Sequence, residues 1–543
     1  MAGSKNPIPY EIKFENSLLD NVHGLIGLTA VENAIEKLPI FKRLHGISQL
    51  GLTNRIFPCA LHNRYTHSLG VVHIVDQMAV SLNFDSDERQ IIRLAAMLHD
   101  IGHYPFSHDV ESVYKEMAPE AKKVASDGKA TKSELHRYAQ NAHKKIEELD
   151  SNKKLNSFFR KGTLPARHHE LIGTIVIKHS NKIKNAINDL YIKNSKKYQK
   201  TDNAHTLDSI IADICAIITG NTQHDSEYFS DKFCAMVQLL HSELDADKID
   251  YLLRDATFSG ASYGNFDAGM LIKFLKMKRD KDGKHYIVGV EPKGICCAEQ
   301  FLLNRYFAYN QIIFHKYSSM LGCALQSVVR WMLQDTASQF TYVDIESMAE
   351  RHEIEDRYIN YTDATLISCI NAVDTRATGC PKIICELITC LKNYQSPNMS
   401  EEYICSGTKP SELKKQIIAH PLYSKLNSAV RNESTVCDIY QYREVLLTQH
   451  VLQAEFDKLP RTHNTKDKPK EEGEDLKESM RLDRLLDGIA VIEEGKAPCL
   501  LIDHDRSMLH DIGKLRYCIL RTYTLSENAQ TDKQKSLRIS PRA

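Results

Sequence analysis

Apolar residues recur at helical spacing through most of the first part of the chain. Over residues 64–82, Leu69, Ile74 and Met78 fall on or near one helical face, whereas residues 88–98 are apolar almost all round. A spacing of three and four residues predicts an amphipathic helix, and a segment that is apolar on every side predicts a buried one. We therefore expect an amphipathic helix followed by a core helix.

Helical spacing returns over residues 206–239 and 243–254, and a long amphipathic pattern covers residues 299–333. Between them, residues 277–290 alternate on either side of a polar turn, which is typical of a β-hairpin. Residues 1–335 are therefore predicted to form a mainly α-helical domain with a small β-hairpin.

Two polar tracts interrupt these patterns. Residues 116–161 are rich in Lys, Glu and Ser and are typical of a solvated insertion, and residues near 462–480 are typical of a charged linker. Residues 336–543 mix short helical patterns with candidate strands at 499–502 and 515–523. We expect this part of the chain to form a mixed α+β C-terminal lobe.

Composition limits the class of protein. The 543 residues include 70 Lys+Arg and 70 Asp+Glu, and this balance argues against nucleic acid as the main partner, although a local basic pocket remains open. The chain has no apolar stretch near the roughly 18 residues that a membrane helix needs. Its 14 cysteines form no C-x-x-C pair and follow no secretory signal. We expect a cytoplasmic protein with reduced thiols and no membrane partner.

Three ionisable side chains enter the predicted helical pair at residues 64–98. His67 lies on the first helix, and the doublet His99-Asp100 ends the second, so imidazole and carboxylate ligands for a divalent ion come together. Gly70 would let a neighbouring helix approach closely, and Gly102 would let the chain turn after the doublet. A lone histidine on an apolar helix is usually a core residue. Three such groups favour metal binding, because a buried polar group without a partner costs about 1–3 kcal/mol.

A fourth ligand candidate lies downstream, in the string DADKIDYLLRD at residues 245–255. On a helix, Asp247, Tyr251 and Asp255 form one stripe, with Lys248 beside it. Taken alone, the stripe is typical of a solvated face with ion pairs. Asp247 becomes a ligand candidate because a metal site built on a helical pair needs a further ligand.

Together these motifs resemble the HD-domain metal phosphohydrolases, and among them the deoxynucleoside triphosphate triphosphohydrolases. The family signature is a His, a His-Asp doublet and a distant Asp. The resemblance covers residues 20–333 and rests on motifs in matching order: DNVHG at 20–24, RLHGISQLG at 43–51, NRYTHSLGV at 63–71, HDIGHYPFSH at 99–108, HHE at 168–170, DADKIDYLLRD at 245–255 and an Arg-to-His-Lys helix at 305–316. It implies a helical HD-domain core. Vertebrate members also carry a sterile-alpha-motif module, which we do not expect in the short lead before residue 20.

The resemblance also implies the site residues. One divalent ion, Mn²⁺, Fe²⁺ or Mg²⁺, would be held by His67, His99, Asp100 and Asp247, with a second Mg²⁺ open as a companion of the triphosphate. His108 would be the general acid, supported by His103 and His169, and Glu111 is placed to orient a histidine.

The substrate contacts follow in the same way. Arg64, Lys248 and Arg305 stand where the family contacts phosphates. Tyr251 and Asp255 would contact the deoxyribose and its 3′-hydroxyl, and Gln49 and Leu50 would pack against the sugar. The implied reaction is attack of water on the α-phosphorus of a dNTP, which releases a deoxynucleoside and inorganic triphosphate.

Several alternatives remain open from the sequence. The chain could be an HD-type nucleotidase or phosphodiesterase for another nucleotide, or a non-catalytic nucleotide-sensing oligomer or nucleic-acid binder. A homo-oligomer, dimer or tetramer, is expected by resemblance. Lys37, Lys42 and His45 do not reproduce the family's guanine-reading pattern, so activation by a guanine nucleotide is not expected, and regulation by another nucleotide or constitutive oligomerisation stays open. A second His-Asp string, at residues 508–514, is assigned to a structural turn because no matching histidine helix precedes it.

Overall fold

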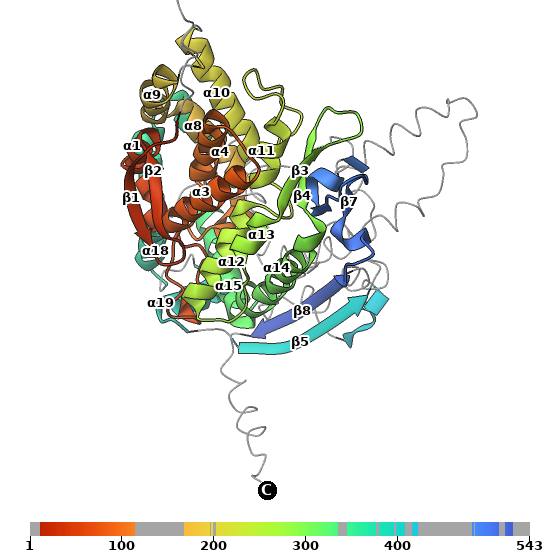
Figure 1. The fold of residues 1–543 in the computed structure, drawn as a ribbon. Helices are drawn as coiled ribbons and strands as arrows, with labels where there is room; N and C mark the ends of the chain where they lie inside the picture. Colours follow the sequence, from red (N-terminus) through yellow and green to blue (C-terminus); the bar gives the residue numbers. More distant parts are fainter. Residues whose placement is uncertain are drawn as a thin grey trace, which may run out of the picture.

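The computed structural model is mainly helical (Figure 1). It describes residues 11–114, 168–195, 197–198, 202–334, 345–375, 380–395, 398–407, 415–416, 418–421, 481–482, 484–509 and 516–524. The predicted insertion at 116–161, the predicted linker at 462–480 and the doublet His510-Asp511 lie outside these residues.

The central helix of the fold is α3 (Arg64–Ser81), which packs against both α4 (Ser86–Leu98) and α12 (Ala246–Ser259) (Figure 1). The surrounding helices are α8 (His168–His179), α9 (Asn181–Leu190), α10 (Asn203–Ile218), α11 (Phe233–Leu240), α13 (Ala268–Lys273), α14 (Ile295–Ala308) and α15 (Lys316–Gln334). The mainly helical fold class and the predicted helical pair are therefore confirmed.

Side chains at the helix ends fix where these helices begin. Asn63 accepts a hydrogen bond from the backbone N–H of Thr66 at the start of α3. Asp85 and Glu88 cap each other's backbone N–H groups at the start of α4, and Asp245 caps α12. Each cap satisfies backbone donors that the first helical turn leaves unpaired. The caps thereby set the register in which α3, α4 and α12 present their side chains to one another.

Two of the predicted helical segments are interrupted. Residues 206–239 form α10 and α11 with a loop between them, and residues 299–333 are divided by a π-helical turn, Tyr309–Ile313. π-turns are rare inside helices and widen the backbone locally. The side chain of Tyr309 thereby comes within 3.3 Å of the hydroxyl of Tyr251 on α12.

The N-terminal part was not predicted. It contains the antiparallel pair β1 (Phe14–Asp20) and β2 (Gly24–Thr29), then α1 (Ala30–Glu36) and α2 (Pro39–Lys42). β1 is largely exposed and shows no clean apolar alternation, so the sequence carries little strand signal there. Short 3₁₀ turns follow and recur later: Arg43–Gly46, Thr53–Arg55, Ile192–Asn194, Pro292–Gly294, Tyr358–Asn360 and Leu501–Asp503.

The predicted hairpin is confirmed as β3 (Leu275–Arg279) and β4 (Tyr286–Val290), which pair antiparallel. Two short strands from the far end of the chain, β6 (Ala490–Val491) and β7 (Cys499–Leu500), extend it to a four-stranded sheet. A separate antiparallel pair joins β5 (Asn398–Gly407) and β8 (Arg516–Thr524). The candidate strand at 515–523 is therefore confirmed, and the one at 499–502 ends early in a 3₁₀ turn.

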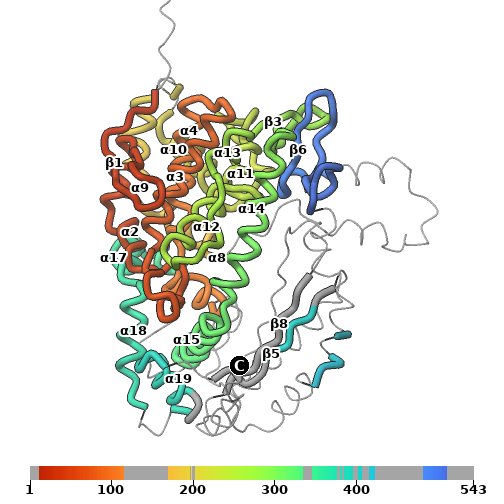
Figure 2. The backbone as a smooth tube through the Cα atoms, turned by 60° about the horizontal axis from the view of Figure 1, so that its bottom comes forward, coloured from red at the N-terminus to blue at the C-terminus, as the bar shows by residue number. Residues whose placement is uncertain are grey.

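Helices beyond residue 335 share the core of the preceding ones. They are α16 (Ile345–Glu350), α17 (Ile354–Arg357), α18 (Asp363–Ala372) and α19 (Lys382–Lys392). Ile354, Leu366 and Leu387 are buried in the same apolar cluster as the residues of α3 and α4. Figure 2 shows α19 beside α15, with α18 next to α19. The division into two domains at 335 stays a prediction.

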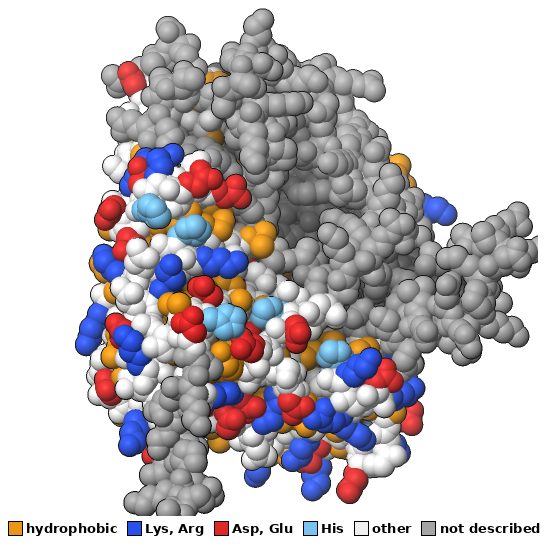
Figure 3. Space-filling view, turned by 90° about the horizontal axis from the view of Figure 1, so that it is seen from above, with side chains coloured by type: hydrophobic (Ala, Val, Ile, Leu, Met, Phe, Trp, Pro, Cys, Tyr) orange, Lys and Arg blue, Asp and Glu red, His pale blue; other side chains and the backbone are white. Residues whose placement is uncertain are grey.

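Charges of both signs are interspersed on one face of the described residues. Figure 3 shows one face on which Lys and Arg alternate with Asp and Glu, without an extended patch of one sign among the residues described there. Within the described ranges, no helix is both long enough and apolar enough to cross a bilayer.

Candidate metal centre and histidine cluster

The four predicted metal ligands converge from three helices. His67 lies on α3, His99 and Asp100 follow the last turn of α4, and Asp247 lies in the first turn of α12. His67 Nε2 is 3.0 Å from Asp247 Oδ1 and 3.7 Å from Asp100 Oδ2, while His99 Nε2 is 3.3 Å from Asp100 Oδ1 and 3.9 Å from Asp247 Oδ1. All four side chains are buried.

These separations suit ligands of one ion. Two atoms bonded at about 2.1 Å to one ion lie about 3.0 Å apart at a right angle and about 3.4 Å apart at the tetrahedral angle. His99 Nδ1 donates to the carbonyl oxygen of Ala96 at 2.7 Å, which leaves Nε2 as the ligand atom. That Nε2 is buried and has no hydrogen-bond partner among the described residues. A divalent ion would satisfy it, so the donor set fits a metal.

The guanidinium of Arg64 lies beside Asp100 and offsets part of the negative charge of the centre. Its Nη1 donates to Asp100 Oδ2 at 2.8 Å and its Nε donates to Ser107 Oγ at 2.9 Å. Although burial opposes the shift, Arg64 and His99 hold the pKa of Asp100 well below its usual range. Burial also disfavours a charged His67, but Asp247 and Asp250 outweigh it and raise the pKa of His67 to about 9. The two aspartates thus create a site for positive charge.

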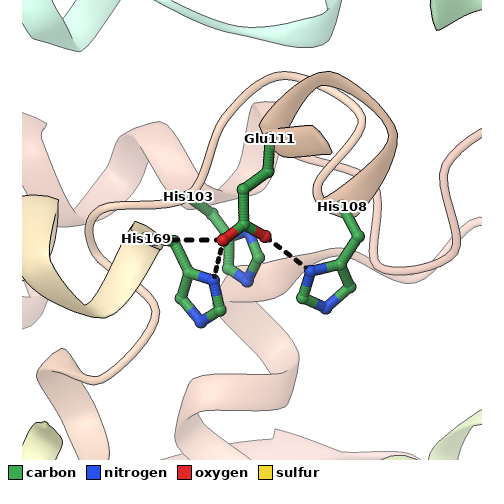
Figure 4. A group of neighbouring side chains, drawn as sticks. All are labelled: His103, His108, Glu111 and His169. Carbon is green, nitrogen blue, oxygen red and sulfur yellow. Dashed lines mark hydrogen bonds and ion pairs between the residues drawn. The ribbon is translucent and has the colours of Figure 1, made fainter. Parts of the chain in front are cut away.

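A second group of side chains adjoins this centre (Figure 4). His103, His108, Glu111 and His169 offer ligand atoms within 4.8 Å of one another, as do His67, His99 and Asp100. Glu111 Oε2 accepts from His108 Nδ1 at 2.7 Å, and Glu111 Oε1 accepts from both the backbone N–H and Nδ1 of His169 at 3.2 Å. The dashed contacts of Figure 4 therefore hold both rings with Nδ1 toward Glu111 and Nε2 turned away.

The histidine cluster and the metal centre share Asp100. His103 Nε2 lies 3.3 Å from Asp100 Oδ1, and His169 Nε2 lies 3.9 Å from the same oxygen. Burial, together with Arg64 and His169, keeps the pKa of His103 well below its usual range, so this ring is neutral. His108 is the member open to solvent, with 58% of its side chain exposed. A molecule entering the site would therefore meet His108 first.

A loop with a strained backbone directly precedes His108 of this cluster. Phe106 and Ser107 both have positive φ angles, 52° and 54°, a conformation that side-chain-bearing residues rarely adopt. The carboxylate of Asp363, at the start of α18, accepts from the Phe106 N–H at 2.6 Å and from both the N–H and hydroxyl of Ser48. These hydrogen bonds offset the backbone strain and tie the loop to the segment that leads to Gln49.

Gly102 lies in the turn that follows the doublet, as predicted, and it also has a second role. A Cβ at this position would lie 2.2 Å from the carbonyl oxygen of His169 and 2.3 Å from the amide nitrogen of Gly173. Gly102 therefore permits the close approach of α8, which carries His169. The prediction for Gly70 is supported, because a Cβ there would lie 1.9 Å from Asp250 Oδ1 on α12.

The three candidate phosphate contacts are all engaged with carboxylates. Arg64 pairs with Asp100, Lys248 Nζ donates to Asp245 at 2.6 Å, and Arg305 forms a buried ion pair with Glu243. Arg305 also lies 6.0 Å from the ring of Tyr309.

Two of the candidate sugar contacts, Asp255 and Gln49, lie beside His62. Its Nε2 lies 2.7 Å from Asp255 Oδ1, and its carbonyl oxygen accepts from the backbone N–H of Gln49 at 3.2 Å. The buried side-chain oxygen of Gln49 has no hydrogen-bond partner within the described ranges, so a ligand hydroxyl or amide would satisfy it. Leu50 is half-buried next to Gln49, and Tyr251 faces Tyr309 instead of His62.

Several partners of these residues were missed from the sequence. Asp250 and Arg254 belong to the string at residues 245–255. Their i,i+4 spacing is typical of an ion pair on a helix and could have identified them. His62 directly precedes the motif at residues 63–71. Glu243 and Asp363 had no local signal, because their partners are 62 and 257 residues away in the chain.

Residues 64–219 match the family model described as the HD domain. YwfO of Bacillus subtilis, an uncharacterized protein, is 25% identical over 312 residues, which is 56% of this chain and 53% of that protein. The deoxynucleoside triphosphate triphosphohydrolase SAMHD1 of Xenopus laevis is 25% identical over 273 residues, which is 49% of this chain and 38% of the enzyme. The chain thus spans about half, or less, of the length of these relatives.

A solved structure shows the same fold along almost the whole chain. A hypothetical protein from Aquifex aeolicus matches with a TM-score of 0.57 and 20% identity, covering 96% of this chain and 99% of that one. The motif at residues 63–71, the His-Asp doublet and the helical centre around them lie in or next to the matched range 64–219. The chain therefore carries an HD domain over residues 64–219.

Proposed function

We propose that this protein hydrolyses deoxynucleoside triphosphates to a deoxynucleoside and inorganic triphosphate. The observation that carries the proposal is that two groups of side chains meet at Asp100: the candidate ligands His67, His99 and Asp247 on one side, and the Glu111-held histidines on the other. Phosphoester hydrolysis needs both charge neutralisation and a proton donor, and this arrangement offers both within one site.

A divalent ion held by His67, His99, Asp100 and Asp247 would supply an activated water and a Lewis acid for a phosphoryl oxygen. The proton for the departing 5′-oxygen of the deoxynucleoside comes from His108 in this proposal. Glu111 accepts from Nδ1 of His108, so the proton to be donated is carried on Nε2, the edge that faces away from Glu111. Burial lowers the pKa of His108 to about 4, and the hydrogen bond to Glu111 opposes this shift by favouring the protonated ring.

The remaining residues bind the substrate. His103 and His169 contact phosphoryl oxygens in this proposal, and Arg64 keeps Asp100 ionised beside them. Lys248 and Arg305 leave Asp245 and Glu243 to meet the β- and γ-phosphates. Gln49 and Asp255, joined through His62, recognise the deoxyribose, and Leu50 and Tyr251 pack against it.

The test is product identification. Purified protein is incubated with each dNTP and each rNTP in the presence of Mn²⁺, Fe²⁺ or Mg²⁺, and the phosphate product is identified by ³¹P NMR. We expect inorganic triphosphate from dNTPs and much slower turnover of rNTPs. Release of monophosphate or pyrophosphate would contradict the proposal and favour a nucleotidase or phosphodiesterase.

We further propose a homo-oligomer with the dNTP as its substrate partner. The support is the resemblance alone. The molar mass of the protein, measured by light scattering with and without nucleotide, tests it: a mass of 61.8 kDa under both conditions would contradict it.

A further inference from the structure

A buried hydrogen-bond network stands behind His67, on the side away from the candidate ion. Asp250 Oδ2 lies 2.7 Å from His67 Nδ1, and Asp250 Oδ1 lies 2.6 Å from His23 Nε2. Arg254 donates to both oxygens of the same carboxylate, at 2.9 and 3.0 Å. Asp250, His67 and Arg254 are all fully buried.

The arrangement fixes which nitrogen of His67 carries the proton. The Asp250 carboxylate forms a two-point ion pair with the guanidinium of Arg254, and an ionised carboxylate only accepts hydrogen bonds. His67 Nδ1 must therefore be the donor. In the neutral form that binds a metal, Nε2 is then the nitrogen with a lone pair, and this is the atom that faces Asp247 and Asp100.

The N-terminal turn holds Asp250 in this position. Asp20 accepts from Arg254 at 2.8 Å and from the backbone N–H of His23 at 3.0 Å, so the turn between β1 and β2 is anchored to α12. His23 in turn stacks on His73 of α3, with ring centroids 5.1 Å apart. Gly70 leaves the space that the carboxylate occupies.

We infer that Asp250 is a positioning residue for the metal ligand His67, and that His23 of the β1–β2 turn is its outer support. This inference rests on the metal site of the proposed function, and it deepens that proposal. The carboxylate sets the orientation and the tautomer of the ring, so its loss weakens metal binding without removing a ligand. Removing such a partner of a ligating histidine typically lowers metal affinity by about 10–100-fold.

The test compares matched variants of the full chain. Asp250→Asn keeps the size of the side chain and removes its charge. Asp213→Asn is the control, because Asp213 is also buried and also lies 2.7 Å from a histidine, His224. The dissociation constant of Mn²⁺ is measured by chelator competition without nucleotide, and the absorption bands of bound Co²⁺ report the ligand geometry.

We expect Asp250→Asn to raise the Mn²⁺ dissociation constant by about 10–100-fold and to change the Co²⁺ bands, with Asp213→Asn unchanged. If Asp250→Asn does not fold, His23→Ala is measured instead, and we expect a smaller rise in its Mn²⁺ dissociation constant. Unchanged affinity in the folded variant, equal weakening in the Asp213→Asn control, or a wild-type protein that binds no Mn²⁺ would each overturn the inference.

These outcomes are separable from the failure of the proposed function. Weakened Mn²⁺ binding in Asp250→Asn, together with a wild-type protein that hydrolyses no dNTP, would contradict the substrate and leave the positioning role intact. Hydrolysis of dNTPs by the wild type, with unchanged Mn²⁺ affinity in Asp250→Asn, would contradict the positioning role and leave the proposed substrate intact.

Discussion

At the scale of single residues, the proposed function assigns metal binding and proton transfer to different side chains of one site. Asp247 faces His67 and His99. His108 contacts Glu111 and is the exposed member of its cluster. Variants of the two residues should therefore fail in different ways.

We expect Asp247→Ala to lose bound metal and activity together. His108→Ala should keep its metal and lose turnover by about 10²–10⁴-fold, the usual contribution of a positioned acid or base. Metal content by elemental analysis and kcat from phosphate release check both. Normal hydrolysis by the Asp247 variant would refute the ligand assignment, and metal loss from the His108 variant would move that histidine into the ligand set.

The pH dependence of stability is also set by single residues. Although burial opposes the shift, Arg254 lowers the pKa of Asp20 below its usual value of 3.8. A carboxyl whose pKa falls on folding contributes stability that is complete above its unfolded pKa and is lost as the pH drops through its folded pKa. Asp20→Asn should therefore cost about 1–3 kcal/mol of unfolding free energy at pH 7. In urea unfolding, its difference from wild type should shrink below pH 3.8. A difference in unfolding free energy that stays constant with pH would contradict the stabilising role of the Asp20–Arg254 ion pair.

At the scale of elements, one glycine decides how closely α3 and α12 can approach. A Cβ at Gly70 would lie 1.9 Å from Asp250 Oδ1 and 2.4 Å from Arg254 Nη2, and all of these atoms are buried. Both charged groups already have their partners, so neither can move away without breaking hydrogen bonds.

Gly70→Ala should therefore destabilise the fold by about 1–3 kcal/mol, the usual cost of overpacking a core. Gly269→Ala in α13 is the matched control, since its nearest neighbour would be 3.5 Å away, and it should be neutral or slightly stabilising. Urea midpoints measure both. Equal midpoints for the two variants would show that the helices can move apart freely.

The sequence predicted the elements whose signal is local. The helical pair, the hairpin β3–β4 and strand β8 followed from periodicity, and the candidate ligands followed from the order of the motifs. The π-helical turn at Tyr309–Ile313 did not, because apolar spacing continues through it. The pairing of β4 with β6 joins segments about 200 residues apart, and such a contact leaves no periodic signal in either strand.

At the scale of the whole molecule, the candidate metal site joins α3, the end of α4 and α12 into one unit. An ion that binds the folded protein and not the unfolded chain stabilises the fold, by about 2.7 kcal/mol when its concentration is 100 times the dissociation constant. We expect Mn²⁺ to raise the Tm of the wild type and to leave that of Asp247→Ala unchanged. Thermal unfolding with and without EDTA measures this. An equal rise in both proteins would indicate binding elsewhere.

The contact of Asp363 with the loop at Phe106 has a consequence for synthesis on the ribosome. The Asp363 carboxylate and the Phe106 amide are separated by 257 residues. The strained backbone before His108 therefore lacks this stabilising hydrogen bond until α18 has been synthesised. A nascent chain that ends after α15 already contains every candidate ligand. We expect such an intermediate to capture its ion early and to acquire an ordered proton donor only once the downstream helices have docked.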